Sequence, residues 1–385
     1  MSNEPGSAET GSPPAPPAQE VSVSRTPSPN KPGPAGSSPP KPSPPKSGSA
    51  RSSPPRSESG RAAAIDSGAN IEVDDAFDDD RDSAIGDAQT TYTSSLASSV
   101  LDYPVEYGRR YHAYRSGRYS RPNDEQEMDR LLLIHEIITL AIGGLYLAPI
   151  EAEKMTRILD IGTGTGAMTI GDEFPNAEVI GNDLSANLPT FVPGNVKFEV
   201  DDVESEWLHD SKFSWIFCRY MAASIFDWPK LVKNIHENLE TGGWCEFQDF
   251  DLLYYSEDGS LAPDNPLLSW ITTLTNAAQS LGRDPNPGSK LEGWVQDAGF
   301  GNIVHRRYKI PFGVWPKDPH LKELGAYNYR QLSEGLEGLT LRLYTSVLGW
   351  NEEEIYALLA QVRRELNNPR IHALFDLHVV YAQKL

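Results

Sequence analysis

A glycine-rich turn between an apolar run and a helix-forming run constrains the fold of this chain more than any other segment. Residues 157–161 read Arg-Ile-Leu-Asp-Ile, the pattern of a short buried strand. The turn Gly162-Thr163-Gly164-Thr165-Gly166 follows, and residues 167–170 are able to begin a helix. Glycines let the main chain turn tightly and approach a ligand closely. A strand, a glycine turn and a helix in this order predict a nucleotide-type binding loop in an α/β fold.

The spacing of this turn does not suit a dinucleotide. A dinucleotide fingerprint is Gly-x-Gly-x-x-Gly, whereas the third glycine here, Gly166, comes one residue early. Asp160 stands two residues before the first glycine, where a carboxylate repels a pyrophosphate and attracts an ammonium group. S-adenosylmethionine carries an amino group, a carboxylate and a sulfonium, and no phosphate. The pattern acid-x-Gly-x-Gly-x-Gly resembles motif I of class I S-adenosylmethionine-dependent methyltransferases; a glycine-rich turn in an unrelated α/β unit is the alternative.

Acidic residues follow the next two predicted strands. Asp183 ends a strand predicted at 177–182, where an acid is placed to accept hydrogen bonds from ribose hydroxyls. A third strand at 196–200 runs into Asp201-Asp202-Val203. In the methyltransferase pattern, the acid after this strand meets the adenine amino group and the next main-chain amide meets the ring. Asp202 with Val203 fits this role best and Asp201 is the second choice, with a solvated loop as the alternative.

Strands and helices keep alternating toward the C-terminus. Strands predicted at 213–218 and 244–247 are followed by Arg219 and Gln248, and a helix between them starts at Trp228 and ends near 241–243. Further helices are predicted at 265–281, 321–348 and 352–366, with strands at 303–310 and within 372–383. We expect the last strand to be an antiparallel edge strand. The alternation argues for a parallel sheet with helices on both faces, whose ligands bind beyond the carboxyl ends of the strands.

The order of motifs from about residue 100 onward resembles the LaeA-like methyltransferase family of filamentous fungi. The segments that carry the resemblance are Tyr107–Tyr119, Pro122-Asn123-Asp124-Glu125, the glycine turn, residues 174–179, Arg219-Tyr220-Met221, residues 242–249, and the tail from Leu336-Glu337-Gly338-Leu339 through Val347-Leu348-Gly349-Trp350. The resemblance implies an α/β, Rossmann-like class I methyltransferase fold with a mostly parallel seven-stranded sheet and an antiparallel last strand. One departure from the family is the helix expected at 167–172, which is about two residues shorter than the usual helix at this place and is interrupted by Gly171. Two residues correspond to a rotation of about 200° along a helix, which has to be absorbed locally.

The same resemblance implies S-adenosylmethionine as cofactor and a role in secondary metabolism and development. The residues expected to bind the cofactor are Asp160, Gly162, Thr163, Gly164, Gly166, Asp183, Leu184, Asp202, Val203 and Arg219. Velvet-type regulators are the partners that the family suggests, in the nucleus or the cytoplasm. Three functions stay open: a methyltransferase that acts in the regulation of secondary metabolism, a methyltransferase that tailors a small metabolite, and a scaffold that keeps the fold without turnover.

Methyl transfer from a sulfonium requires mainly proximity and orientation, and a general base only if the acceptor arrives protonated. The candidates for such a base are His112, Tyr111 and Asp249, and the sequence shows no metal-ligating constellation. Residues 103–119, rich in tyrosine and arginine, form either a lid with Tyr111, His112 or Tyr114 facing a ligand or a flap that packs on the core. His135, alone on a helix predicted to be capped by Asn123 with Gln126, is interpreted as structural.

The N-terminal part differs in composition from the rest. Of the 31 prolines, 16 lie in residues 1–60, and an acidic run follows, so residues 1–100 are predicted to be a disordered arm. Residues 101–385 then form the methyltransferase domain, with a lid and helix at 101–150, a cofactor-binding half at 157–250, and a cap with sheet completion at 251–385. Trp270 in this cap either lines an acceptor cavity or packs in the core.

Charge and cysteine content exclude several other classes of protein. A net charge of −20 argues against nucleic-acid binding by bulk electrostatics. The two cysteines, Cys218 and Cys245, indicate a reducing compartment and not a disulfide scaffold. No apolar run is long enough to span a membrane.

Overall fold

The structure is a computed structural model that describes residues 102–117, 119–164, 166–186 and 192–385. The predicted arm at 1–100 lies outside the described residues. Within them, no helix is both long and apolar enough to cross a bilayer.

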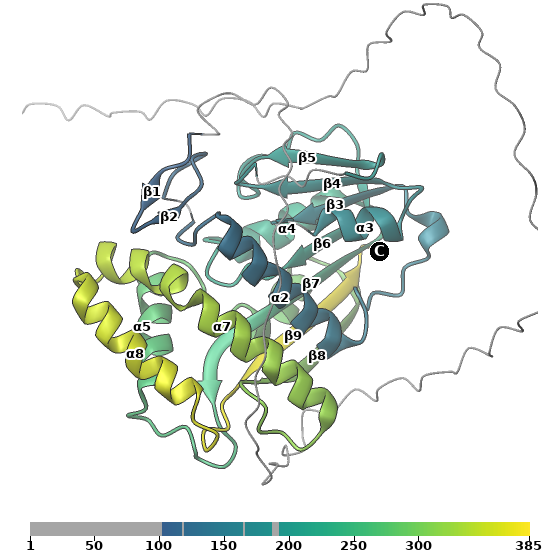
Figure 1. The fold of residues 1–385 in the computed structure, drawn as a ribbon. Helices are drawn as coiled ribbons and strands as arrows, with labels where there is room; N and C mark the ends of the chain where they lie inside the picture. Colours follow the sequence, from purple (N-terminus) through teal and green to yellow (C-terminus); the bar gives the residue numbers. More distant parts are fainter. Residues whose placement is uncertain (1–101, 118, 165, 187–191) are drawn as a thin grey trace, which may run out of the picture.

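A seven-stranded sheet in the order β5-β4-β3-β6-β7-β9-β8 forms the centre of the described chain (Figure 1). Its strands are β3 (Arg157–Ile161), β4 (Glu178–Asp183), β5 (Val196–Val200), β6 (Phe213–Arg219), β7 (Leu239–Tyr255), β8 (Gly301–Pro311) and β9 (Leu374–Gln383). Neighbouring strands from β5 to β7 run parallel, while β9 is antiparallel to both β7 and β8. The mostly parallel sheet with an antiparallel last strand is confirmed. The expectation of an edge position is wrong, because β9 is inserted between β7 and β8.

Helices cover both faces of this sheet, and the helices of the third cluster described below form a helical cap at one end of it. They are α2 (Glu125–Ile142), α3 (Ala167–Glu173), α4 (Trp228–Asn238), α5 (Pro266–Ser280), α6 (Leu291–Asp297), α7 (Pro319–Ser346) and α8 (Glu352–Leu366), with 3-10 turns at Ala152–Lys154 and Gly288–Lys290 and a small hairpin of β1 (Val105–Glu106) and β2 (Arg109–Arg110). One buried cluster joins α4 and α6 to the sheet, and another joins α3 to its opposite face. A third cluster joins α2, α5, α7 and α8 to the far ends of β7, β8 and β9 (Figure 1).

Strand β7 is much longer than the sequence predicts. Helix α4 ends at Asn238 and not near 241–243, and β7 then runs to Tyr255 instead of ending at Phe247. The extra length is paired with β9, whose Leu374 lies opposite Tyr255. Gln248 therefore lies within a strand, although it is level with Arg219 at the carboxyl end of β6.

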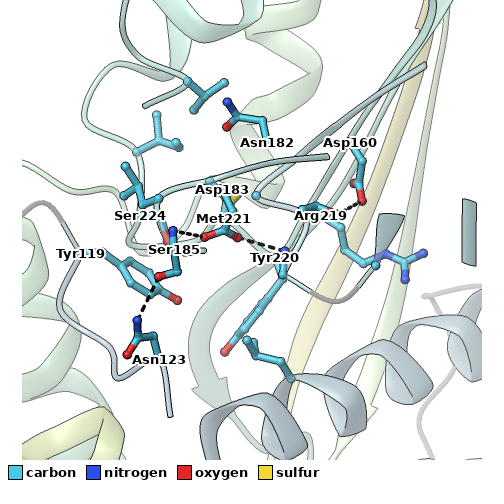
Figure 2. A pocket seen from close by; sticks show the side chains of 18 of the residues that line it. Tyr119, Asn123, Asp160, Asn182, Asp183, Ser185, Arg219, Tyr220, Met221 and Ser224 are labelled. Carbon is cyan, nitrogen blue, oxygen red and sulfur yellow. Dashed lines mark hydrogen bonds between the residues drawn. The ribbon is translucent and has the colours of Figure 1, made fainter. Parts of the chain in front are cut away.

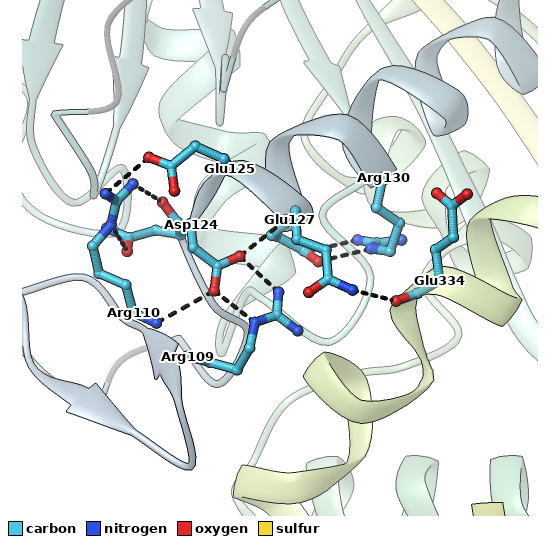
Figure 3. Close-up of polar contacts among 9 residues, drawn as sticks. Arg109, Arg110, Asp124, Glu125, Glu127, Arg130 and Glu334 are labelled. Atoms are coloured by element: carbon cyan, nitrogen blue, oxygen red, sulfur yellow. Dashed lines mark hydrogen bonds and ion pairs between the residues drawn. The ribbon is translucent and has the colours of Figure 1, made fainter. Parts of the chain in front are cut away.

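Helix α2 begins one residue later than predicted. Its N-cap is Asp124, whose carboxylate accepts from the Glu127 amide at 3.1 Å and also binds Arg109 of β2 at 2.6 Å (Figure 3). An ion pair that fixes the carboxylate makes it a better cap than the neighbouring amide of Asn123. Asn123 instead donates from its side chain to the hydroxyl of Ser185, after strand β4.

Gly171 does not interrupt the helix after the glycine turn. Helix α3 continues to Glu173, and Gly171 is buried within it. A Cβ at this position would lie 2.2 Å from Cγ2 of Val196 on β5. The glycine therefore lets the short helix approach the sheet closely, at a modest cost in helix propensity.

Candidate functional site

A cavity opens at the carboxyl ends of β3, β4, β5 and β6, beside helix α2 (Figure 2). All of the predicted cofactor-binding residues line it: Asp160, Gly162, Thr163, Gly164, Gly166, Asp183, Leu184, Asp202, Val203 and Arg219. Asp201, the second choice for the adenine contact, lines it too. The topology explains this gathering, since carboxyl ends of adjacent parallel strands meet at one edge of a sheet.

Main-chain hydrogen bonds hold the glycine turn over this edge. Gly162 and Gly164 both have positive φ, at 65° and 50°, a conformation that residues other than glycine rarely adopt. The amide of Gly164 donates to Asp183 at 2.9 Å. Thr163 donates from its hydroxyl to Asp160 and accepts from the amide of Ala167, so it fixes the start of α3. The turn is thereby tied to two of the predicted acids.

Asp160 is the most unusual charge in the cavity. It is only 3% exposed, and burial raises the pKa of its carboxyl to about 7, against the lowering effect of the Thr163 hydroxyl and the Arg219 guanidinium. An ammonium group that binds beside a carboxylate kept out of water in this way stabilises its charged form. Asp160 therefore suits a positively charged ligand group and not a phosphate.

Asp183 occupies the matching position on β4. Besides the Gly164 amide, its carboxylate accepts from the amide of Ser185 at 2.9 Å. Burial raises its pKa as well, more than these two amides lower it. Two main-chain donors orient the carboxylate and leave acceptor capacity for a pair of hydroxyl groups.

The tyrosine-rich segment closes the cavity at the end of β5. Tyr114 donates from its hydroxyl to Asp201 at 3.2 Å, and Arg115 pairs with Asp202 at 2.7 Å. Tyr119 lines the cavity itself. Of the described residues of this segment only Tyr119 lines the cavity, whereas Tyr111, His112 and Tyr114, the residues expected to face a ligand, do not; Tyr111 and His112 are fully buried, as the packing-flap alternative expects.

The three candidate bases lie outside the cavity lining. His112 is fully buried, with its ring nitrogens 2.8 and 3.1 Å from the main-chain oxygens of Tyr114 and Tyr119. Tyr111 is fully buried against Arg342, and burial raises its pKa to about 12. Asp249 accepts from three main-chain amides, although burial raises its pKa to about 7.

His135, which the sequence analysis interpreted as structural, lines the cavity next to Arg219. The guanidinium of Arg219 donates to Nδ1 of His135 at 3.0 Å, to Gln248 at 2.7 Å and to the carbonyl of Leu145 at 2.6 Å. Since a guanidinium only donates, Nδ1 of His135 accepts and the remaining proton is on Nε2. Burial, with Arg219 beside it, lowers the pKa of His135 to about 4.

Sequence reasoning missed most of the opposite wall. Met128, Leu131 and Ile134 of α2 line the cavity, together with Tyr220, Met221, Ser224 and Arg283. The helical period of the α2 residues was visible in the sequence, but a period shows only that a face is buried. It does not show whether that face covers a core or a ligand.

These residues fit S-adenosylmethionine. Asp160 is positioned for an amino group, Asp183 for ribose hydroxyls, and Asp202 with the Val203 amide for adenine, while Arg219 supplies donors for a carboxylate. The parallel sheet with its antiparallel strand and this set of strand-end residues define a class I S-adenosylmethionine-dependent methyltransferase.

Comparison with known proteins identifies the family. A family model described as a methyltransferase domain matches residues 133–305. The chain is 46% identical over 295 residues to methyltransferase pytC of Aspergillus terreus, covering 76% of this chain and 91% of that protein. It is 36% identical over 289 residues to the secondary metabolism regulator LAE1 of Cochliobolus heterostrophus, covering 73% and 94%. It is 34% identical over 318 residues to the secondary metabolism regulator laeA of Monascus pilosus, covering 79% and 86%. The chain belongs to the LaeA-like methyltransferase family.

Proposed function

We propose that this chain transfers a methyl group from S-adenosylmethionine to an acceptor of secondary metabolism. The observation that supports this most is the presence of Asp160, Asp183 and Asp202, at or just after the carboxyl ends of three adjacent strands, in the lining of one cavity. When bound, the cofactor supplies an electrophilic methyl group on a sulfonium. The residues of the chain bind the cofactor, orient it and exclude water.

Arg219 and His135 have different roles at this site. The Arg219 guanidinium stays cationic even though burial lowers its pKa to about 10, so it is able to hold a carboxylate. His135, kept neutral, presents an N–H donor and not a basic nitrogen. Of the three predicted bases, none lines the cavity, so we propose that orientation carries the catalysis.

A regulatory role is the second candidate, and the names of two relatives favour it, because LAE1 and laeA are both called secondary metabolism regulators. In that role the family suggests velvet-type partners and a place in the nucleus or the cytoplasm. A scaffold without turnover remains the third reading. It predicts that the cofactor binds and that a stable protein partner is present, but that no methylated product forms.

Calorimetric titration of the full chain with S-adenosylmethionine and with its demethylated product tests the site. We expect Asp183→Ala to weaken binding at least about tenfold, because a charge-assisted acceptor of about 1.5–3 kcal/mol is removed. Asp210→Ala, at an exposed position away from the cavity, is the matched control and should bind like the wild type. Absence of binding to the folded wild-type chain would refute the proposed methyltransferase.

A further inference from the structure

Helix α2 contributes one polar side chain to the wall of the cofactor cavity. The residues of this helix that line the cavity are Met128, Leu131, Ile134 and His135. Asp160 and Arg219 are at one end of the cavity, and Asn123 and Ser185 are at the other (Figure 2). His135 belongs to the first end, because it is hydrogen-bonded to Arg219. A few well-placed polar groups in an otherwise apolar wall are what orients a ligand in a pocket.

The contact with Arg219 fixes the ring of His135 and leaves one donor available. Nδ1 of His135 accepts from Nη1 of Arg219 at 3.0 Å, so the ring proton is on Nε2. Within the described part of the chain, Nδ1 is the only ring nitrogen of His135 that has a hydrogen-bond partner. Nε2–H is therefore a donor on a side chain that lines the cavity, and a group that enters the cavity is able to accept from it.

Arg219 also has donors left beside this ring. Of the five N–H donors of a guanidinium, three go to neutral groups, which are the Gln248 side chain at 2.7 Å, the Leu145 carbonyl at 2.6 Å and His135. Asp160 and Glu246 favour the charge of Arg219 electrostatically, but no direct ion pair joins them to it within the described residues. A buried guanidinium whose hydrogen bonds go to neutral groups keeps the capacity to bind an anion.

Strand β7 holds Arg219 in place before any ligand arrives. Gln248 accepts from Nε of Arg219 and itself donates to Glu246 at 2.6 Å. The carboxylate of Glu246 also accepts from the amides of Leu147 at 2.9 Å and Ala148 at 2.6 Å, in the loop after α2. Glu246 is thus committed to this loop and is not available to pair with Arg219. Such a supporting network arranges the donors of a binding site in advance.

We propose that Nε2–H of His135, together with the two remaining donors of Arg219, binds the carboxylate of S-adenosylmethionine. This inference rests on the proposed methyltransferase function and adds to its site a cofactor-binding residue that orients the methyl donor. A neutral donor suits this position, because a second cation beside Arg219 would repel the ammonium group that Asp160 is positioned to bind.

The test compares two ligands of the full chain by calorimetry. They are S-adenosylmethionine and decarboxylated S-adenosylmethionine, in which a hydrogen atom replaces the carboxylate while the ammonium group, the sulfonium and the adenosine are kept. We expect the wild type to bind S-adenosylmethionine at least about tenfold more tightly, because hydrogen bonds to a charged group are lost with the carboxylate. Equal affinities would show that the site does not bind the carboxylate and would overturn the inference.

His135→Asn separates the two edges of the ring. The amide oxygen of asparagine is able to replace Nδ1 opposite Arg219, but the shorter side chain does not reach the position of Nε2. We expect this variant to bind S-adenosylmethionine about tenfold more weakly and the decarboxylated ligand as the wild type does. His135→Gln, which is long enough to place a donor near Nε2, should recover part of the lost affinity. If His135→Asn does not fold, His135→Phe keeps the ring volume and should show the same selective loss.

Two results with these variants would contradict the inference. An equal loss of affinity for both ligands would make His135 a structural residue, and an unchanged affinity for S-adenosylmethionine would show that Nε2–H does not contact the cofactor. Glu136→Gln, at the next and exposed position of α2, is the matched control and should bind both ligands as the wild type does. Failure of the wild type to bind either ligand contradicts the proposed function itself, whereas loss of the expected selectivity contradicts only the role of His135.

Discussion

The carboxylates at the sheet side of the cavity and the Arg130 guanidinium of the neighbouring helical cap are all buried, but they are held by different means. On the sheet side, Asp160 and Asp183 bond to the Thr163 hydroxyl and to the amides of Gly164 and Ser185, all within one strand, turn, helix and strand unit. On the cap side, Arg130 pairs with Glu127 three residues away, but it also bonds to Gln331, 201 residues away, and to Tyr220, 90 residues away. The acids are therefore encoded within one local motif, whereas Arg130 depends in addition on the assembled tertiary structure.

The largest expected effect comes from breaking the buried pair on the cap side. Glu127 and Arg130 have side chains only 1% exposed, so Glu127→Gln leaves an uncompensated buried cation. We expect a loss of about 3–5 kcal/mol in the free energy of unfolding, measured by urea denaturation. Glu125→Gln, in the exposed pair with Arg110, should cost less than about 1 kcal/mol. Similar losses for both variants would remove the distinction between structural and exposed cations.

A smaller effect is expected where α7 packs against α2. A Cβ at Gly335 would lie 2.3 Å from Cδ of Arg130, whose guanidinium is held on three sides and is not able to move away. Gly335→Ala should reduce the free energy of unfolding by about 1–3 kcal/mol. Gly293→Ala, in open space on α6, should instead stabilise by up to about 1 kcal/mol. Urea denaturation of both variants measures the contrast, and a stabilised Gly335→Ala would show that the contact is loose.

The third prediction concerns the sheet side and the pH. In the cofactor-free protein the pKa of Asp160 is about 7, so below pH 7 the carboxyl is mostly protonated and does not attract an ammonium group. Binding of S-adenosylmethionine should therefore weaken about tenfold per pH unit as the pH falls from 7 to 5. Calorimetry across this range should show the slope in the wild type and a nearly flat profile in Asp160→Asn. An equally steep slope in Asp160→Asn would assign the proton to another group.

The parts of the molecule that are encoded locally were also the parts that could be predicted from the sequence. The glycine turn and the strand-end acids were predictable, because Asp160, Asp183 and Asp202 each occupy a fixed place in a local strand-turn pattern. The end of β7 was not, since its extra length exists only through pairing with β9. Nor was the network around Arg130 predictable, because Gln331 and Tyr220 come from distant parts of the chain that no local pattern connects. Trp270 had both an acceptor and a packing interpretation; it is fully buried in the cluster of the helical cap and donates to the Thr340 hydroxyl at 2.9 Å.

The inner position of β9 also bears on the order in which the protein can be made. This strand is synthesised after both of its neighbours, and it pairs Gln383 with Trp244 of β7 and with Gly301 of β8. Until β9 has been made, β7 lacks one of its partners and β8 lacks its partner in the sheet, and such unpaired edges are templates for pairing with other chains. The nascent chain thus passes through a stage in which strands β3 to β8 have been made but β8 is not yet joined to the sheet. We expect chaperones to bind the chain at this stage.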